Sequence, residues 1–246
     1  MYTSSAVAEL EACRAVLTGP SSDSVILAVH GKYSHQADAD IQTLMDVAVP
    51  RGHQVLTFDL PGHGNRPGSP DELRISAAAG EVAGMCAWAG EHFPRRRCFA
   101  TSLGAYLSLV SIPADALEEA WLLSPVTDMG ALVRGLMSMF DITEDDLRQQ
   151  QTITTPVETL EWAQYRFIAE HPVGGWATPT RILRGAHDDL VPPGSIETFC
   201  ERTGATLTVA PDSGHYFHTE SDLAQLRSWL EQVVPVEARA LDQAGE

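Results

Sequence analysis

The feature that most constrains the fold is a regular alternation of short apolar runs with longer segments of helical periodicity. The runs are rich in Val, Ile and Leu and predict strands at 24–30, 54–59, 98–102, 120–124, 180–185 and 205–210. Helical patterns lie near 36–50, 72–92, 103–112, 194–203 and 220–234. Apolar runs without alternation are typical of strands covered on both faces. Strands alternating with helices form βαβ units. The sequence therefore predicts an α/β fold with a mostly parallel, doubly wound sheet of about six strands.

Two regions depart from this alternation. Near the N-terminus, Val7, Leu10, Arg14 and Leu17 recur at helical spacing, which predicts a helix instead of the antiparallel strands that often open such sheets. The second region, about 126–178, separates two predicted strands by far more chain than one crossover helix needs. We therefore expect a single domain, 1–246, with its core at about 1–125 and 179–246 and a helical cap insertion at about 126–178.

The charge of the chain limits its partners. Sixteen basic residues against thirty-three acidic ones give a formal net charge of −17, and so acidic a surface repels nucleic acid and anionic lipid. We expect a small-molecule substrate, no nucleic-acid or membrane partner, and a monomer or homodimer. The four cysteines lack metal-like spacing, and no dinucleotide fingerprint or phosphate-binding loop is present, so we expect neither metal nor cofactor. The absence of a signal-peptide pattern and of a bilayer-length apolar run predicts a cytoplasmic protein.

The strongest chemical signal is the sequence ATSLG at 100–104, where a predicted buried strand ends and a helix begins. A nucleophilic serine at such a turn needs small residues two positions away on either side. Gly104 meets this need, and Ala100 stands where glycine is usual. Short Ser–Gly turns are common, so the motif alone has a purely structural explanation as well. Ser102 is followed in the chain by Asp188 and His215, each just after a predicted strand, and open α/β sheets hold their catalytic groups at that end.

Further motifs surround these residues in a fixed order. HG at 30–31 ends one strand and DLPGHG at 59–64 ends the next. After the ATSLG sequence come GAHDDLVP at 185–192 and SGH at 213–215. With these motifs the chain, from about residue 24 to residue 230, resembles the α/β-hydrolase family, in particular small capped bacterial esterases and lipase-like members. The resemblance implies an enzyme that hydrolyses a small carboxylic ester.

The resemblance also assigns roles to individual residues. Ser102 would attack the acyl carbon, with His215 as the base that removes its proton. Asp188 would hold the imidazole in the correct tautomer and stabilise the imidazolium. The backbone N–H groups of Lys32 and Leu103 would bind the oxyanion.

Other assignments remain open for several residues. Asp189 or Asp128 could supply the acid, although the spacing after the glycine favours Asp188. His218 is interpreted as a residue of the substrate pocket or one that supports His215. His63 is interpreted as stabilising its own loop. His30 either orders the oxyanion turn, contacts substrate or packs in the core.

Substrate choice is expected to depend on the insertion and on the turn that carries Lys32. Lys32 is the only lysine in the chain. Its side chain either lies exposed in a loop or meets an anionic part of the substrate. Tyr33 is a further candidate for substrate contact. In the insertion, Met137, Phe140 and Trp162 either form the inner face of amphipathic helices or cover the active site, and flexible Met side chains fit varied apolar shapes. We expect a short or medium acyl chain, or an aromatic acid, with weak discrimination.

Related reactions remain alternatives, because the fold and a triad do not fix the substrate. A thioesterase, lactonase, amidase or carbon–carbon bond hydrolase could use the same residues, as could a peroxidase-like enzyme. A non-catalytic ligand-binding protein on this scaffold is an alternative of a different kind. That alternative is disfavoured because the serine, the acid and the histidine are all present.

Overall fold

The computed structural model describes residues 2–237, and within them the main sheet has eight strands in the order β1-β2-β4-β3-β5-β6-β9-β10. From β4 to β10 all neighbouring strands pair in parallel, as the sequence predicts. The six predicted strands are β3 (Ser24–Val29), β4 (Gln54–Thr57), β5 (Arg95–Thr101), β6 (Glu119–Leu123), β9 (Thr180–Gly185) and β10 (Thr206–Ala210).

The burial of β3 explains its apolar run. All six of its residues are buried. Val25, Leu27 and Val29 pack into the hydrophobic core on one face of the sheet, and Ile26 and Ala28 pack into the core on the other face. Because successive side chains of a strand point to opposite faces, a strand between two helical layers must be apolar at every position.

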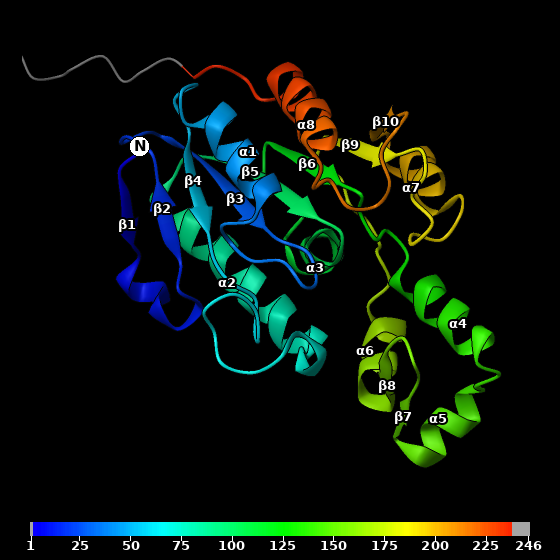
Figure 1. The fold of residues 1–246 in the computed structure, drawn as a ribbon. Helices are drawn as coiled ribbons and strands as arrows, with labels where there is room; N and C mark the ends of the chain where they lie inside the picture. Colours follow the sequence, from blue (N-terminus) through cyan, green and yellow to red (C-terminus); the bar gives the residue numbers. More distant parts are fainter. Residues whose placement is uncertain (1, 238–246) are drawn as a thin grey trace, which may run out of the picture.

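Helices cover both faces of the sheet, as Figure 1 shows. One face carries α1 (Ala39–Ala48) and α8 (Glu220–Val233), which pack against each other. The other face carries α2 (Ile75–His92) and α3 (Leu103–Ser111), and α7 (Ser195–Thr203) packs into the same core. A short 3₁₀ turn, η2 (Pro70–Glu72), precedes α2. These helices match the predicted ones. Within residues 2–237, no helix is both long enough and apolar enough to cross a membrane.

The prediction of an N-terminal helix is wrong. Residues at the start form β1 (Ser4–Ala6), a 3₁₀ segment η1 (Ala8–Cys13) and β2 (Val16–Thr18), and β2 pairs antiparallel with both β1 and β4. The 3₁₀ segment is interrupted at Leu10, whose φ is −117°. The antiparallel strands expected to be missing are therefore present, and they bring the sheet to eight strands instead of about six.

The segment between β6 and β9 leaves the sheet and projects from it in Figure 1. It contains α4 (Met129–Met139), α5 (Glu144–Gln150), a hairpin of β7 (Thr152–Thr154) and β8 (Thr159–Glu161), and α6 (Trp162–Glu170). The hairpin departs from the expectation of a purely helical insertion. Met137, Leu147 and Leu160 form a small core of their own inside the segment.

A buried ionic cluster lies where β5 begins, at the end of the strands opposite to Ser102. The Arg97 guanidinium donates a hydrogen bond to Glu237 at 2.8 Å and contacts Glu118 at 2.7 Å, and Arg95 also pairs with Glu237. The side chains of Arg97 and Glu237 are nearly inaccessible. This cluster fixes the chain after α8 against the sheet, far along the strands from Ser102.

Candidate active site

Ser102 lies in a sharp turn between β5 and α3. Its φ of 51° and ψ of −114° belong to a region that non-glycine residues rarely occupy, and strain of this kind persists only where the surroundings enforce it. Its N–H donates to the Leu123 carbonyl at 3.0 Å. A Cβ at Gly104 would collide with the carbonyl oxygens of Val29 and His30, so this position of α3 must be glycine for the helix to pack beside β3.

The hydroxyl of Ser102 faces the imidazole of His215. Ser102 Oγ is 2.9 Å from His215 Nε2, and His215 Nδ1 is 2.9 Å from Asp188 Oδ2. The other carboxylate oxygen of Asp188 accepts the N–H groups of Leu190 at 3.1 Å and Val191 at 3.2 Å. The structure thus places Ser102, His215 and Asp188 in one hydrogen-bonded chain.

The hydrogen bonds keep Asp188 ionised despite its burial. Burial raises the pKa of the carboxyl, but the hydrogen bond from His215, its charge and the two backbone N–H bonds together lower the pKa below its usual value. Asp188 follows β9, and His215 lies in the loop after β10. A Cβ at Gly185 would collide with the carbonyls of Ser213 and Gly214, so the two loops pack in direct contact.

The two alternative acids lie elsewhere. Asp189 is exposed and makes no hydrogen bond to His215 within the described residues. Asp128 caps α4, where its side chain accepts the N–H of Ala131 at 2.7 Å.

His30 orders the turn that follows β3. It is fully buried, and its Nε2 accepts the N–H of Leu60 at 3.0 Å. The ring proton must therefore be on Nδ1, which donates to the Gly31 carbonyl at 2.8 Å. This carbonyl shares its peptide plane with the N–H of Lys32, so the bond is one restraint on the direction of that N–H. Burial lowers the pKa of His30 to about 4, which keeps the ring neutral.

His63 braces the same turn from the other side. Its Nε2 accepts the N–H of Tyr33 at 3.2 Å, and its Nδ1 donates to the Pro61 carbonyl at 2.8 Å. The rings of His30 and His63 lie 5.2 Å apart between centroids. Burial lowers the pKa of His63 as well. Both histidines therefore stabilise loops, and neither lines the cavity described below.

Two backbone N–H groups near Ser102 are free to bind an anion. Within residues 2–237 neither Lys32 N–H nor Leu103 N–H has a hydrogen-bond acceptor. Leu103 is the first residue of α3, where a helix leaves its N–H groups without internal partners. A Cβ at Gly31 would lie 3.3 Å from the Ser102 Cβ, so the turn that carries Lys32 lies directly against the turn at Ser102.

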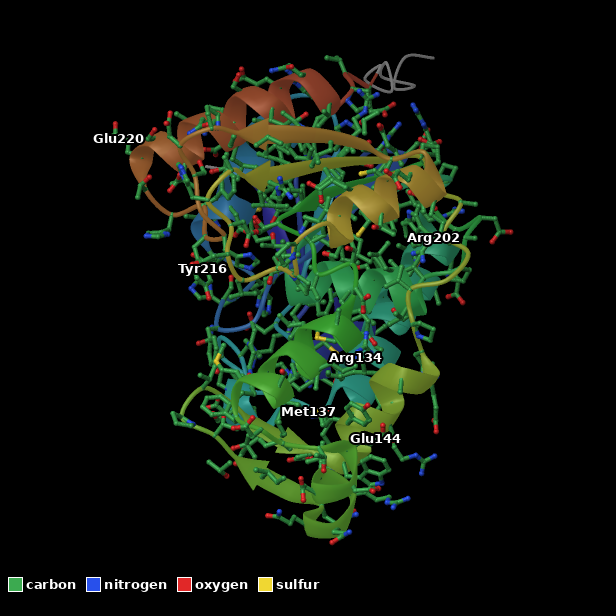
Figure 2. All side chains as sticks on the ribbon, turned by 90° about the vertical axis from the view of Figure 1, so that its right-hand side faces the viewer. Arg134, Met137, Glu144, Arg202, Tyr216 and Glu220 are labelled. Atoms are coloured by element: carbon green, nitrogen blue, oxygen red, sulfur yellow. The ribbon has the colours of Figure 1, made fainter. Side chains whose placement is uncertain are left out.

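A cavity of about 460 Å³ opens beside Ser102 and His215. In Figure 2 the inserted segment forms the lower part of the molecule, with Met137 labelled, and Tyr216 lies at the edge of the core that faces this segment. The roof is mostly apolar, although Glu161 and Gln164 also line it, and one stripe of α4 at i, i+3, i+4 and i+7 contributes Met129, Leu132, Val133 and Leu136. The mouth is polar, with Tyr33, Glu158, Tyr216 and His218 among its residues.

The structure brings only some of the predicted substrate contacts to the cavity. Tyr33 and His218 line the cavity, whereas Met137, Phe140 and Trp162 do not. Met137 faces the small core of the insertion, and Trp162 stacks on Tyr165 with ring centroids 5.6 Å apart. Phe140 follows the last turn of α4. The helical stripe at 129–136 was readable in the sequence and would have identified the lining face.

The Lys32 side chain is paired within the protein. Its ammonium contacts the two carboxylate oxygens of Glu158, at 2.5 and 2.7 Å, so it is not a solvated loop group, and a substrate anion would have to compete with Glu158 for it. Glu158 had no signal in the sequence, because the contact spans 126 residues.

No protein-family model matches the sequence, and no curated protein matches it. Solved structures do match. Est1E from Butyrivibrio proteoclasticus, with ferulic acid bound, is 16% identical with a TM-score of 0.73, covering 89% of this chain and 92% of that one. Alpha/beta hydrolase domain-containing protein 10 from mouse is 15% identical with a TM-score of 0.71, covering 95% and 98%. The Pyrococcus furiosus esterase Pf2001 is 17% identical with a TM-score of 0.60, covering 95% and 93%. Since these likenesses span almost the whole chain, and since the sheet is mostly parallel with helices on both faces, the protein has the α/β-hydrolase fold.

Proposed function

We propose that this protein is a serine hydrolase that cleaves small carboxylic esters through an acyl-enzyme, with Ser102, His215 and Asp188 as its catalytic triad. The observation that carries the proposal is the hydrogen-bonded chain from Ser102 Oγ through His215 to Asp188 at the wall of the cavity. A serine hydroxyl is a weak nucleophile unless a neighbouring base accepts its proton, and His215 Nε2 lies within proton-transfer distance.

In the first half of the reaction, Ser102 Oγ bonds to the acyl carbon while its proton passes to His215 Nε2. The carbonyl oxygen of the ester becomes an oxyanion, for which the free N–H groups of Lys32 and Leu103 are the donors. Asp188 stabilises the imidazolium formed at this stage. Collapse of the tetrahedral species breaks the bond to the alcohol oxygen, and His215 gives its proton to that oxygen.

In the second half, a water molecule attacks the acyl-Ser102 ester and gives one proton to His215. The bond to Ser102 Oγ then breaks, and the same proton returns to that oxygen. The products are the free acid and the restored hydroxyl. The same groups act twice with their proton roles reversed.

The apolar roof favours an acid part with little polarity. A cavity of about 460 Å³ lies within the range typical of small-molecule sites. The α4 stripe presents four aliphatic side chains and no charge, which suits a short or medium acyl chain or an aromatic ring. The similar structure of Est1E holds ferulic acid, an aromatic acid, which supports the second choice.

The proposal is tested first by labelling with a fluorophosphonate, which reacts with an activated serine. Labelling of the wild-type protein and its loss in Ser102→Ala are expected. Ser111→Ala is the matched control, because Ser111 lies at the end of the same helix, hydrogen-bonded to Leu107 and outside the cavity lining. Failure of well-folded wild-type protein to label would favour a ligand-binding protein instead.

The substrate class is tested with p-nitrophenyl esters of graded chain length beside feruloyl, thioester, lactone and amide substrates. We expect the highest kcat/KM for oxygen esters with short, medium or aromatic acyl groups. A higher value for thioesters or amides would contradict the assignment of the bond while leaving the triad intact.

A further inference from the structure

One ion pair joins the inserted segment to the turn that carries the proposed oxyanion donor. Lys32 Nζ lies 2.5 and 2.7 Å from the two carboxylate oxygens of Glu158, and the side chains are only 22% and 33% exposed. Among residues 2–237 this is the only ion pair between the segment 126–178 and the rest of the chain. Partial burial weakens screening by solvent, so this pair is stronger than a fully exposed one.

The hairpin holds the backbone of Glu158 in place. Thr155 Oγ accepts the N–H of Glu158 at 2.9 Å and donates to the Glu158 carbonyl at 2.7 Å. The N–H of Thr155 donates to the same carbonyl at 3.0 Å. Because the backbone of Glu158 is held on both sides, its side chain reaches Lys32 from a rigid turn.

The turn after β3 needs such restraints because it is strained. Tyr33, next to Lys32, has a φ of 62°, a left-handed conformation that costs a non-glycine residue free energy. Its N–H is held by His63, and its hydroxyl donates to Asp71 at 2.7 Å. The Lys32 ammonium lies 5.0 Å from the Tyr33 ring centroid, within the range of a cation–π contact. Glu158 thus fixes the ammonium that rests on the strained residue.

We propose that Glu158 is a positioning residue, which acts through Lys32 to keep the Lys32 N–H directed at the oxyanion when the inserted segment covers the cavity. The position of the segment and the geometry of the oxyanion turn are then coupled. The inference rests on the proposed function, since it presumes an oxyanion formed at Ser102.

The test is Glu158→Gln, which keeps the size of the side chain and removes its charge. Removing an oxyanion donor entirely costs about 10²–10³ in kcat, and a misdirected donor should cost less, on the order of tenfold. We expect this loss in kcat with KM nearly unchanged, because the oxyanion exists only in the transition state. Affinity for a boronic acid, which mimics the tetrahedral species at the serine, should fall by the same factor. If Glu158 merely anchors the segment over the substrate, KM should rise and kcat should stay the same, which would overturn the proposal.

Salt and further variants sharpen the test. Raising the ionic strength from about 0.05 to 0.5 M should lower kcat of the wild type and leave Glu158→Gln unaffected, because salt screens the ion pair. Lys32→Met should lose as much kcat as Glu158→Gln, and the double variant should lose no more than either. Glu158→Asp should retain part of the effect.

Glu170→Gln is the matched control. It removes a carboxylate from an ion pair on α6, with Arg166, that does not reach the core or the cavity, and its activity should equal that of the wild type. Melting temperatures of all variants verify that they fold. An active wild type with unchanged kcat in Glu158→Gln would overturn this proposal alone. A wild type inactive toward every ester would overturn the proposed function together with it.

Discussion

Replacing Asp188 by asparagine tests the proposed mechanism because the structure predicts how the new amide must lie. One oxygen of Asp188 accepts the N–H groups of Leu190 and Val191 at 3.1 and 3.2 Å. The amide oxygen of Asn must occupy that position, since an NH₂ group there would face two donors. Its NH₂ group then points at His215 Nδ1 and donates to it. The ring proton moves to Nε2, where it faces the Ser102 hydroxyl, and the base can no longer accept a proton from that hydroxyl.

The size of the expected loss in kcat follows from the geometry of the Asp188–His215 pair. Asp188 and His215 are in contact at 2.9 Å, with side chains 0% and 4% exposed. At this separation and an effective dielectric constant of about 20, a carboxylate stabilises an imidazolium by about 6 kcal/mol. Since about 1.4 kcal/mol corresponds to a tenfold change in rate, the expected loss in kcat is about 10⁴-fold.

The assay is ester hydrolysis under single-turnover and steady-state conditions, with the melting temperature as a check on folding. Asp189→Asn is the matched control, because its side chain is exposed and makes no bond to His215 within the described residues. It should keep wild-type kcat. A loss below about tenfold in folded Asp188→Asn, or a larger loss in Asp189→Asn, would refute the assignment of the acid and the tautomer argument with it.

Three further predictions concern stability and specificity. From pH 6.5 to pH 4, His30 alone should lower the free energy of unfolding by about 3 kcal/mol, because its pKa, lowered to about 4 by burial, lets it bind a proton in that range only when unfolded. Urea titrations measure this loss of stability, and a flat profile would contradict it. Arg97→Met removes the buried partner of Glu237, so it should lower the free energy of unfolding by about 3 kcal/mol and the melting temperature by about 6–12 °C. Labelling of Ser102 should be unaffected. A shift in melting temperature below about 2 °C would count against a stabilising role of Arg97. Leu132→Trp should narrow the cavity and lower kcat/KM for octanoyl relative to acetyl esters by about tenfold or more. The two p-nitrophenyl esters measure this ratio of kcat/KM values, and an unchanged ratio would show that the acyl chain binds elsewhere.

The central strands and the three residues joined at the cavity could be predicted because their signals are local. A strand buried on both faces must be apolar throughout, and the carboxyl ends of parallel strands lie at one edge of the sheet. Ser102, Asp188 and His215 each follow such a strand, so the order of motifs was enough to bring them together.

The contacts that the sequence did not reveal depend on pairing between distant segments. The strands β1 and β2 have three residues each, and β2 is fixed by its pairing with β4, about forty residues later, so the local helical spacing was misleading. Glu158 meets Lys32 across 126 residues, and Glu237 meets Arg97 across 140. Residue type alone favoured Met137 as a lining residue, whereas helical periodicity decides which face of α4 lines the cavity.

The attachment of the insertion has a consequence for how such a protein can change. β6 and β9 are hydrogen-bonded parallel neighbours, so the chain leaves the sheet at the carboxyl end of β6 and crosses back to the amino end of β9 before it re-enters. A segment of different length or shape could replace this connection without disturbing the strand order or the turn at Ser102, provided that it still crosses from one end of the sheet to the other and fills the places of Val173 and Trp176 in the main core. New acyl preferences would then require remodelling only the part of this connection that lies over the cavity, and among residues 2–237 Lys32 is the one cation outside the segment that a replacement would have to supply with a carboxylate.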